Sequence, residues 1–418
     1  MGSVTFSMIA LMIPFLVLKL LQVLWTVFWQ PYSLTKRLKK QGISGPPRRI
    51  ISGSLDEIKK MKMEAREMIL DTNSNDIVQR VLPHYHRWSS KYGETFLYWH
   101  GTTLHLFIPD PELAKQILSN KFGFYMKPRV LPIFLTLAGN GLILLDGLNW
   151  VRHRRISNPA FSLDKLKFMV KRMAACAISM LQEWKDQIAN DGCKKIEMLA
   201  EFQRLTADIV AHTAFGSNYV DGKEVFQAQR QLQRLYAATN SNIFIPGGEY
   251  LATPSNLQIW KLDRKMKRLI RQIIESRLQK SRTTNGSSPG CFGDDLLGLM
   301  IGALETGQLK TDLKLNMDEI IEESKTFFFA GHETTSSLLT WTMFLLSKHR
   351  EWQAKLREEV LKECEEGIPD ADMLAKLKLV NMVLLEVLRL YGPAIILVRE
   401  ASEDMTLGNL MIPKKTVI

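Results

Sequence analysis

Residues 316–347 read NMDEIIEESKTFFFAGHETTSSLLTWTMFLLS and form the most strongly helical stretch of the chain. Asn316 is a favourable N-cap residue, and Glu319, three positions later, completes the pattern of a capping box. At 1.5 Å per residue the predicted helix is about 45 Å long, enough to cross a whole domain. Its second half is apolar, so we expect that half to be buried.

A polar motif, AGHETT at residues 330–335, interrupts this helix. Gly331 costs about 1 kcal/mol relative to Ala, and a carboxylate and hydroxyls in an apolar setting need partners or a function. Two interpretations stay open. The glycine admits a flat or bulky group, or it marks a helix crossing, with Thr334 bonded to its own backbone. A membrane metalloprotease is disfavoured, because H-E-x-x-H needs a second histidine where Ser336 stands.

Two further pairs occur on predicted helices. Glu386 and Arg389 are three residues apart in a helix expected over 370–390, so they share one face and can pair. Their neighbours are apolar, which favours a pair in a buried helix over surface decoration. Trp150 and Arg154 are four residues apart, and an indole N–H beside a guanidinium is a good clamp for carboxylates. A surface basic patch is the alternative for this second pair.

The remaining pattern is mostly helical. Helical periodicity covers the segments 164–190, 198–216, 222–238 and 255–280, and Asp110-Pro111-Glu112 opens another helix. Strand patterns cover the segments 96–99, 105–109 and 416–418, together with a hairpin about Gly408 and Asn409. Residues 281–293 are the best linker candidate. The predicted fold class is therefore mainly α with small β-sheets.

The composition is that of a globular protein. The chain has 418 residues, 46% of them apolar and 23% charged, which excludes a disordered or collagen-like chain. Its four cysteines have no C-x-x-C spacing, so neither a disulfide scaffold nor a structural zinc site is expected. The formal net charge of +12 is spread along the chain. It favours an acidic partner or an anionic membrane over nucleic acid, for which no motif is present.

The N-terminus has the pattern of a membrane anchor. Residues 8–29 contain one charge, Lys19, and at 1.5 Å per residue they span about 33 Å, enough for a hydrocarbon core of about 30 Å. Basic residues follow between positions 36 and 40, so the positive-inside rule places the rest of the chain in the cytosol. We therefore expect an anchor at 1–30, a basic and Pro-rich hinge at 31–60 and one domain at 61–418. A buried core helix is the alternative to the anchor.

The ordered set of motifs resembles the microsomal cytochrome P-450 family, the haem-thiolate monooxygenases. The anchor, the Pro-rich hinge, W-x-x-x-R at 150–154, A-G-x-E-T-T at 330–335 and E-x-x-R at 386–389 follow one another as in that family. NPAF at 158–161, AFGS at 214–217 and LRLYGPA at 388–394 are similar to plant-type members. The resemblance implies a cytochrome P-450 fold, haem b as cofactor, and insertion of one oxygen atom from O₂ into a lipophilic small molecule.

The resemblance assigns several candidate residues to the haem. Trp150 and Arg154 would hydrogen-bond a haem propionate, and Arg399 would be a further propionate partner. Ala330 and Gly331 would leave room over the haem face for oxygen and substrate.

Other motif residues are assigned to proton handling and to structure. Glu333 and Thr334 would be the catalytic residues, organising protons and water for cleavage of the bound O–O bond. Glu386 and Arg389 would be a structural pair that stabilises the haem-side core.

The resemblance also implies partners and a location. Electrons would come from an NADPH–cytochrome P-450 reductase, an acidic flavoprotein that docks on the basic face formed by Arg152, Arg155, Lys165 and Lys167. Segments 126–141 and 245–254 would shape substrate access. The protein would be a single-pass protein of the endoplasmic reticulum membrane with a cytosolic catalytic domain. Plant-type relatives act on hormones, fatty acids and terpenoids, and the sequence does not choose among these substrates.

One feature of the family has no counterpart in this sequence. The family ligates iron through a cysteine in an F-x-x-G-x-R-x-C-x-G loop, and the four cysteines here, Cys176, Cys193, Cys291 and Cys364, all lack that context. No metal ligand is therefore assigned, and we expect a chain truncated before this loop. The alternative hypothesis is a non-catalytic polypeptide (a partial gene model, isoform or pseudogene product) that cannot ligate haem iron. For this chain we expect a reduced carbon-monoxide spectrum without a thiolate-type Soret band.

Overall fold

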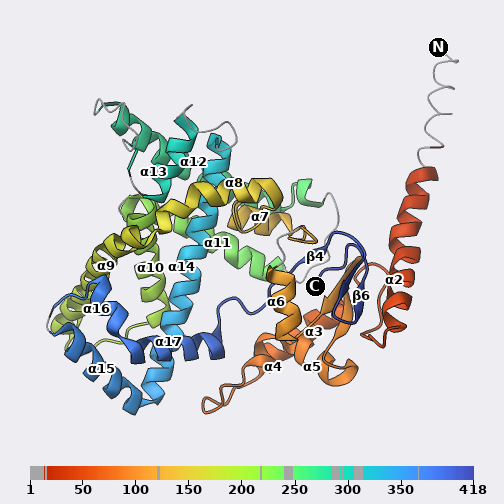
Figure 1. Cartoon of the computed structure of the whole chain (residues 1–418), viewed down its shortest axis with the longest axis horizontal. Coiled ribbons are helices and arrows are strands. Elements are labelled where there is room, and N and C mark those ends of the chain that lie inside the picture. The colour runs from red at the N-terminus through yellow and green to blue at the C-terminus, as the bar shows by residue number, and fades with distance from the viewer. Residues whose placement is uncertain are drawn as a thin grey trace. The chain divides into compact units, whose positions relative to one another are not determined.

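The computed structural model describes residues 14, 17–119, 123–216, 219–239, 248–283, 292–293, 295–305, 314–365 and 367–418. The chain divides into two compact units (Figure 1). Unit 1 contains Met1–Arg129, Ala238–Glu249 and Val398–Ile418. Unit 2 contains Val130–Ala237 and Tyr250–Leu397.

Unit 1 combines short helices with small antiparallel sheets. Its helices are η1 (Trp25–Trp29, a π-helix), α2 (Gln30–Lys39), α3 (Leu55–Glu67), α4 (Val78–Val81), α5 (Pro83–Tyr92) and α6 (Pro111–Ser119). Its strands are β1 (Phe96–His100), β2 (Thr103–Phe107), β3 (Tyr125–Met126), β4 (Glu400–Ala401), β5 (Met405–Leu407) and β6 (Leu410–Ile412). The 3-10 turn η3 (Gly248–Tyr250) lies at the boundary between the units.

The strand predicted at 96–99 and the hairpin about Gly408 and Asn409 are confirmed, the strand predicted at 105–109 begins and ends two residues earlier, and the run at 416–418 forms bridges through Val417 instead of a strand. β1 pairs with β2, so that Phe96 lies opposite Phe107. β5 and β6 form the predicted hairpin, in which Gly408 adopts a positive φ of 55°. The strand-like run at 416–418 is hydrogen-bonded on both sides, because the Leu106 N–H donates to the Val417 carbonyl at 2.7 Å and the Ile418 N–H donates to the Arg399 carbonyl at 2.7 Å.

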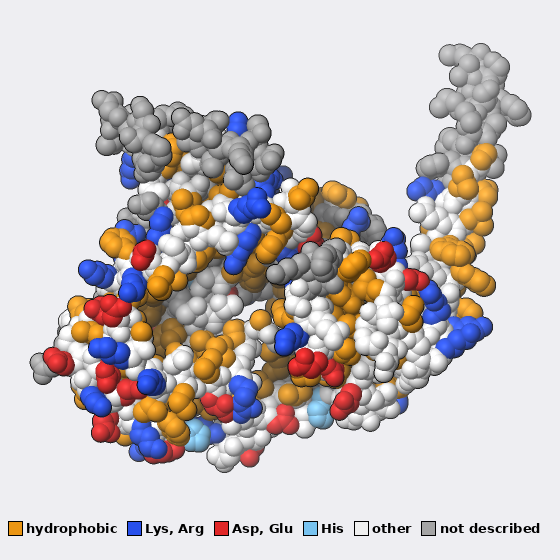
Figure 2. Space-filling model, viewed as in Figure 1, with side chains coloured by type: hydrophobic (Ala, Val, Ile, Leu, Met, Phe, Trp, Pro, Cys, Tyr) orange, Lys and Arg blue, Asp and Glu red, His pale blue; other side chains and the backbone are white. Residues whose placement is uncertain are grey.

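Part of the predicted anchor lies outside the described residues, namely 8–13 and 15–16. From Val17 the chain is helical into η1 and α2, and its hydrophobic side chains are exposed along this helix (Figure 2). Among the described helices, none combines the length and the apolar character that a membrane crossing requires.

Unit 2 is a helical assembly built around α14 (Met317–Lys348). The elements before α14 are α7 (Pro132–Ala138), α8 (Gly147–Ser157), η2 (Asn158–Phe161), α9 (Leu163–Asp191), α10 (Met198–Ala214), α11 (Tyr219–Thr239), α12 (Pro254–Thr283) and α13 (Leu296–Glu305). After it come α15 (Arg350–Cys364), α16 (Ala371–Lys376) and α17 (Lys378–Tyr391). Of the predicted linker, residues 284–291 lie outside the described chain, and so does Cys291.

The capping box predicted for α14 is confirmed. The Asn316 side chain accepts from the Glu319 N–H at 2.9 Å, and the Glu319 carboxylate accepts from the Asn316 N–H at 2.8 Å. The first half of the helix enters the main core, where the Phe328 ring stacks on the Phe215 ring of the segment after α10, with centroids 4.1 Å apart.

Two sequence-based expectations about helices are wrong. The second half of α14 is mostly partly buried or exposed, because its buried residues gather before Gly331. The single helix expected over 370–390 is two helices, with non-helical backbone at Leu377 (ψ 79°). The break is stabilised by Glu359 of α15, whose carboxylate accepts from the Leu379 and Val380 N–H groups at 2.8 and 3.0 Å and so satisfies the first turn of α17.

Candidate functional site

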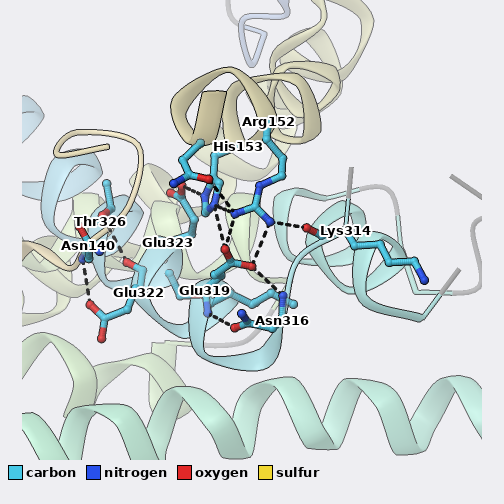
Figure 3. Close-up of polar contacts among 12 residues, drawn as sticks. Asn140, Arg152, His153, Lys314, Asn316, Glu319, Glu322, Glu323 and Thr326 are labelled. Carbon is cyan, nitrogen blue, oxygen red and sulfur yellow. Dashed lines mark hydrogen bonds and ion pairs between the residues drawn. The ribbon is translucent and has the colours of Figure 1, made fainter. Parts of the chain in front are cut away.

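One face of α8 is fixed to the start of α14 by charged side chains (Figure 3). Arg152 forms an ion pair with Glu319, and its Nη1 also donates to the Lys314 carbonyl at 2.7 Å. Burial raises the pKa of Glu319, but hydrogen bonds from the Asn316 N–H and from Arg152 outweigh burial, so the pKa lies below its ordinary value. The capping residue of α14 therefore also holds α8.

A second pair lies deeper in the same contact. His153 Nδ1 and Glu323 Oε1 are 2.5 Å apart, and the two side chains are only 2% and 1% exposed (Figure 3). Glu319 and Glu323 are one turn apart on α14, while Arg152 and His153 are neighbours on α8. The two pairs together fix both the position and the rotation of α8.

The two residues predicted to clamp a carboxylate lie on the side of α8 that faces away from Arg152. Trp150 and Arg154 are one turn apart and exposed. Neither side chain has a hydrogen bond or an ion pair with any residue that the structure describes. The structure therefore presents an indole N–H and a guanidinium together on a helix whose position is fixed by its contacts with α14.

Gly331 lies where α14 contacts α10. A Cβ atom at this position would come within 2.7 Å of Val210 Cγ2, a distance that real Cβ atoms do not reach. In the next residue, the His332 carbonyl accepts from Thr206 Oγ1 of α10 at 3.0 Å. The helix-crossing interpretation of this glycine is thus supported, and Ala330 beside it is partly buried.

Glu333 and Thr334 point in different directions, since successive helical residues are rotated by about 100°. Glu333 Oε1 lies 3.2 Å from His332 Nε2. Burial raises the pKa of Glu333, but His332, a hydrogen bond from Gln233 and the charge of Arg230 outweigh burial, so its pKa is lowered. Thr334 is exposed, and its Oγ1 donates to the Ala330 carbonyl at 2.8 Å.

The Glu386–Arg389 pair forms as predicted, but its burial was predicted wrongly. Arg389 Nε and Nη2 donate to the two carboxylate oxygens of Glu386 at 2.7 and 2.6 Å. The side chains are 53% and 67% exposed, because α17 buries only Val387 and Tyr391 among the described residues. The bidentate hydrogen bonds from Arg389 lower the pKa of Glu386.

The other candidates are distributed over both units. Arg399 belongs to unit 1, and its Nη1 donates to the Val398 carbonyl at 2.8 Å. On the predicted docking face, Arg152 is held by Glu319, and Lys167 pairs with Asp372 at 2.7 Å. These two charges are therefore paired within the chain.

The two predicted access segments are only partly observed. The segment 126–141 contains the helix α7, on which Leu135 is exposed. In the segment 245–254, residues 245–247 lie outside the described chain.

Sequence reasoning missed the network behind the clamp. Arg152 was assigned to a docking face, and His153 and Glu323 were not singled out. A signal was available in the spacing of Glu319 and Glu323, because two acidic residues one turn apart face the same side. This spacing did not show that α8 would supply the partners of Glu319 and Glu323.

Comparisons with known proteins agree with this geometry. The family model described as Cytochrome P450 matches residues 70–418. Cytochrome P450 709B1 of Arabidopsis thaliana is 51% identical over 424 residues, covering 100% of this chain and 80% of that protein. Cytochrome P450 709B3 of the same plant is 51% identical over 406 residues, covering 97% and 77%. The crystal structure of the heme domain of cytochrome P450DA has a TM-score of 0.67 at 23% identity, covering 90% of this chain and 75% of that one.

The chain belongs to the cytochrome P450 family, whose members are haem-dependent monooxygenases. The predicted fold class, cofactor and enzyme class are thereby confirmed. The described residues fit part of a haem site. Trp150 and Arg154 are two donors without an internal acceptor among these residues, which suits an external ligand that carries carboxylates, as the haem propionates do. Cys176 and Cys364 are buried and Cys193 is exposed.

Proposed function

We propose that this chain oxidises a lipophilic small molecule and holds the haem propionates with Trp150 and Arg154. The observation that carries this proposal is the contrast between the paired and the unpaired side chains of α8. Arg152 and His153 hold the helix against α14, whereas Trp150 and Arg154 are exposed and have no partner among the described residues. A clamp fixed from behind loses little entropy on binding, so it can hold an anionic group strongly. The bound haem supplies the O₂ chemistry.

The motif of α14 supplies groups that can hold and move protons. We propose that the exposed Thr334 hydroxyl donates a hydrogen bond toward the oxygen site, exchanging its bond to the Ala330 carbonyl for this one. Glu333 remains ionised because its pKa is lowered, so its carboxylate can orient a water molecule by accepting a hydrogen bond from it. Ala330 and Gly331 keep this part of the helix narrow. Arg399 is proposed as a further propionate partner.

The finer assignments concern partners and location. The apolar composition of the segment 126–141, with Leu135 exposed on α7, supports a lipophilic substrate. We propose that an NADPH–cytochrome P-450 reductase docks on the basic face formed by Arg152, Arg155, Lys165 and Lys167, and that the N-terminal helix anchors the protein in the endoplasmic reticulum membrane with the catalytic part in the cytosol. The exposed apolar residues from Val17 to Trp29 and the basic residues of α2 support this location.

Haem retention tests the clamp. The double variant Trp150→Ala/Arg154→Ala is expected to lose most of the haem that the unaltered chain carries after expression and gel filtration, measured as pyridine haemochromogen per chain. Arg155→Ala, one residue further on α8, is expected to keep its haem. Equal haem content in the double variant and in Arg155→Ala would contradict the clamp. No haem in the unaltered chain would instead support the non-catalytic polypeptide.

A further inference from the structure

A group of potential metal ligands lies between α9 and α10 in unit 2. Cys176 comes from α9, and Asp208 and His212 come from α10, where they are one turn apart. One ligand atom from each of the three side chains lies within 4.8 Å of the others. His212 Nδ1 and Asp208 Oδ1 are 3.0 Å apart. No motif connects these residues, because Cys176 and Asp208 are separated by a whole interhelical connection.

One carboxylate oxygen of this group has no hydrogen-bond partner among the described residues. Asp208 Oδ1 is buried and has no hydrogen-bond partner among the described groups. His212 Nδ1 does not satisfy it, since this nitrogen hydrogen-bonds the Asp208 carbonyl, 3.0 Å away. A buried carboxylate oxygen without a partner costs free energy, so its arrangement calls for an explanation. Cys176 is only 8% exposed, and burial, followed by the charge of Asp208 and a hydrogen bond with the Asp208 side chain, raises the pKa of its thiol to about 12.

The three side chains also line one cavity. Its volume is about 1130 Å³, and Ser179 and Gln272 contribute to its wall. Two arginines of this wall already have partners: Arg172 donates to the backbone carbonyl of His212 at 2.9 Å, and Arg277 pairs with Asp295 at 3.0 Å. An ion held by the three ligands would therefore have one side open to the cavity, with room for a water molecule.

We propose that Cys176, Asp208 and His212 bind a Zn²⁺ ion, with water as the fourth ligand. Sulfur, nitrogen and carboxylate oxygen together select zinc over Mg²⁺ and Ca²⁺, which prefer oxygen ligands. Zinc bonds of about 2.0–2.3 Å place tetrahedral ligand atoms roughly 3.5 Å apart, so a contraction of about 1 Å from the observed arrangement completes the site. On binding, the Cys176 S–H bond breaks, the S–Zn bond forms and the proton passes to solvent. The thiolate and the carboxylate then neutralise the two charges of the ion.

The site is tested on the whole chain by its zinc content. The protein is stripped with a chelator, supplied with one equivalent of Zn²⁺, passed through a desalting column and analysed for zinc and iron separately by elemental mass spectrometry. One zinc per chain is expected. Changes in groups around a metal ligand cost 10–100-fold in affinity, so removal of a ligand by Cys176→Ser or His212→Ala is expected to cost at least about 100-fold. Cys364→Ser, at the other buried cysteine of the described chain, and His349→Ala, at an exposed histidine, are expected to retain zinc.

Two further measurements distinguish the loss of a zinc ligand from the loss of the fold. Far-ultraviolet circular dichroism must match between Cys176→Ser and Cys364→Ser, and alkylation of Cys176, followed by peptide mass spectrometry, must be slower with Zn²⁺ than without it. Zinc retention that is equal in Cys176→Ser and the unaltered chain would overturn the site. Displacement of zinc by millimolar Ca²⁺ or Mg²⁺ would overturn the assigned ligand set, because it would show that the thiolate is not a ligand.

Discussion

The two halves of α14 use their polar side chains in opposite ways. In the first half, Glu319 and Glu323 reach α8, and Lys325 reaches Asp263 of α12 at 3.0 Å. In the second half, hydroxyls bond carbonyls of the same helix, as Thr334 does with Ala330 and Thr340 with Ser336. The first half therefore connects α14 to α8 and α12. The second half leaves the Thr334 hydroxyl exposed, where a bound molecule can engage it.

This difference has an energetic consequence. A buried charge that loses its partner retains the full cost of leaving water, whereas an exposed hydroxyl exchanges one weak hydrogen bond for another with water. Substitutions in the first half should therefore act on stability, and substitutions beyond Gly331 should act mainly on chemistry. Four predictions test this division.

The largest effect is expected from Glu323→Ala. Removing one partner of a buried pair typically costs about 3–5 kcal/mol, because the remaining group stays buried without compensation. The free energy of unfolding by urea should fall by that amount. Asp318→Ala on the same helix is the matched control, since the Asp318 side chain is 87% exposed, and it should change stability by less than about 0.5 kcal/mol.

His153→Ala provides the cross-check on this pair. Its loss should be similar to that of Glu323→Ala, and the double variant should lose much less than the sum, because residues in contact are not additive. Additive losses would mean that the two side chains stabilise the chain independently and that the pair does not hold α8.

The next effect is expected from Gly331→Ala. The added methyl group meets Val210 and should destabilise the chain by about 1–3 kcal/mol, reduced by the gain of about 1 kcal/mol that Ala brings to a helix. Val210→Ala in the same chain should restore stability. Gly302→Ala on α13, where no described atom outside the helix's own backbone lies within 4 Å of the added carbon, should stabilise the protein by about 0.5–1 kcal/mol. An unchanged free energy of unfolding in Gly331→Ala would show that α10 moves aside at this crossing at little energetic cost.

The sequence predicted what depends on neighbours along the chain. The capping box at Asn316 and Glu319 and the pairing of Glu386 with Arg389 need only local spacing, and both are present. The burial of a side chain depends on which other element packs against it, and the predictions of burial were wrong. The Glu386–Arg389 pair is exposed, and the helix breaks at Leu377 because Glu359 of a different helix caps the new start.

The candidate site shows the same limit. Trp150 and Arg154 were found from a spacing of four residues, and the structure leaves them together on one face. Their support by Arg152 and His153 requires Glu319 and Glu323 of α14, which lie 167 and 170 residues further along the chain. The group of Cys176, Asp208 and His212 was missed for the same reason. A search for C-x-x-C spacing cannot detect ligands that two helices bring together.

A smaller effect is expected from Glu333→Gln and should depend on pH. The pKa of Glu333 is lowered from its ordinary value of 4.5 in the folded chain. The charged form therefore contributes stability above that value, about 1 kcal/mol, which is lost as the pH falls through the lower folded pKa. Urea unfolding between pH 7 and pH 3.5 should show the two proteins converging at low pH. Gln233→Ala, which removes one group that lowers this pKa, should give an intermediate curve, and parallel curves would contradict the assignment.

The smallest effect on stability is expected from Thr334→Ala, and it separates the two halves of α14 most directly. The hydroxyl is exposed and bonded only to its own helix, so the free energy of unfolding should change by less than about 0.5 kcal/mol. If the hydroxyl serves the oxygen site, product formed per NADPH consumed should fall, while haem content stays unchanged. Thr334→Ser, which keeps the hydroxyl, should restore most of this coupling. Thr340→Ala removes the same kind of helix-internal bond two turns away and should leave coupling intact, because position 340 lies outside the motif. A loss of coupling in both variants would place the effect in the whole second half of the helix instead of in one hydroxyl.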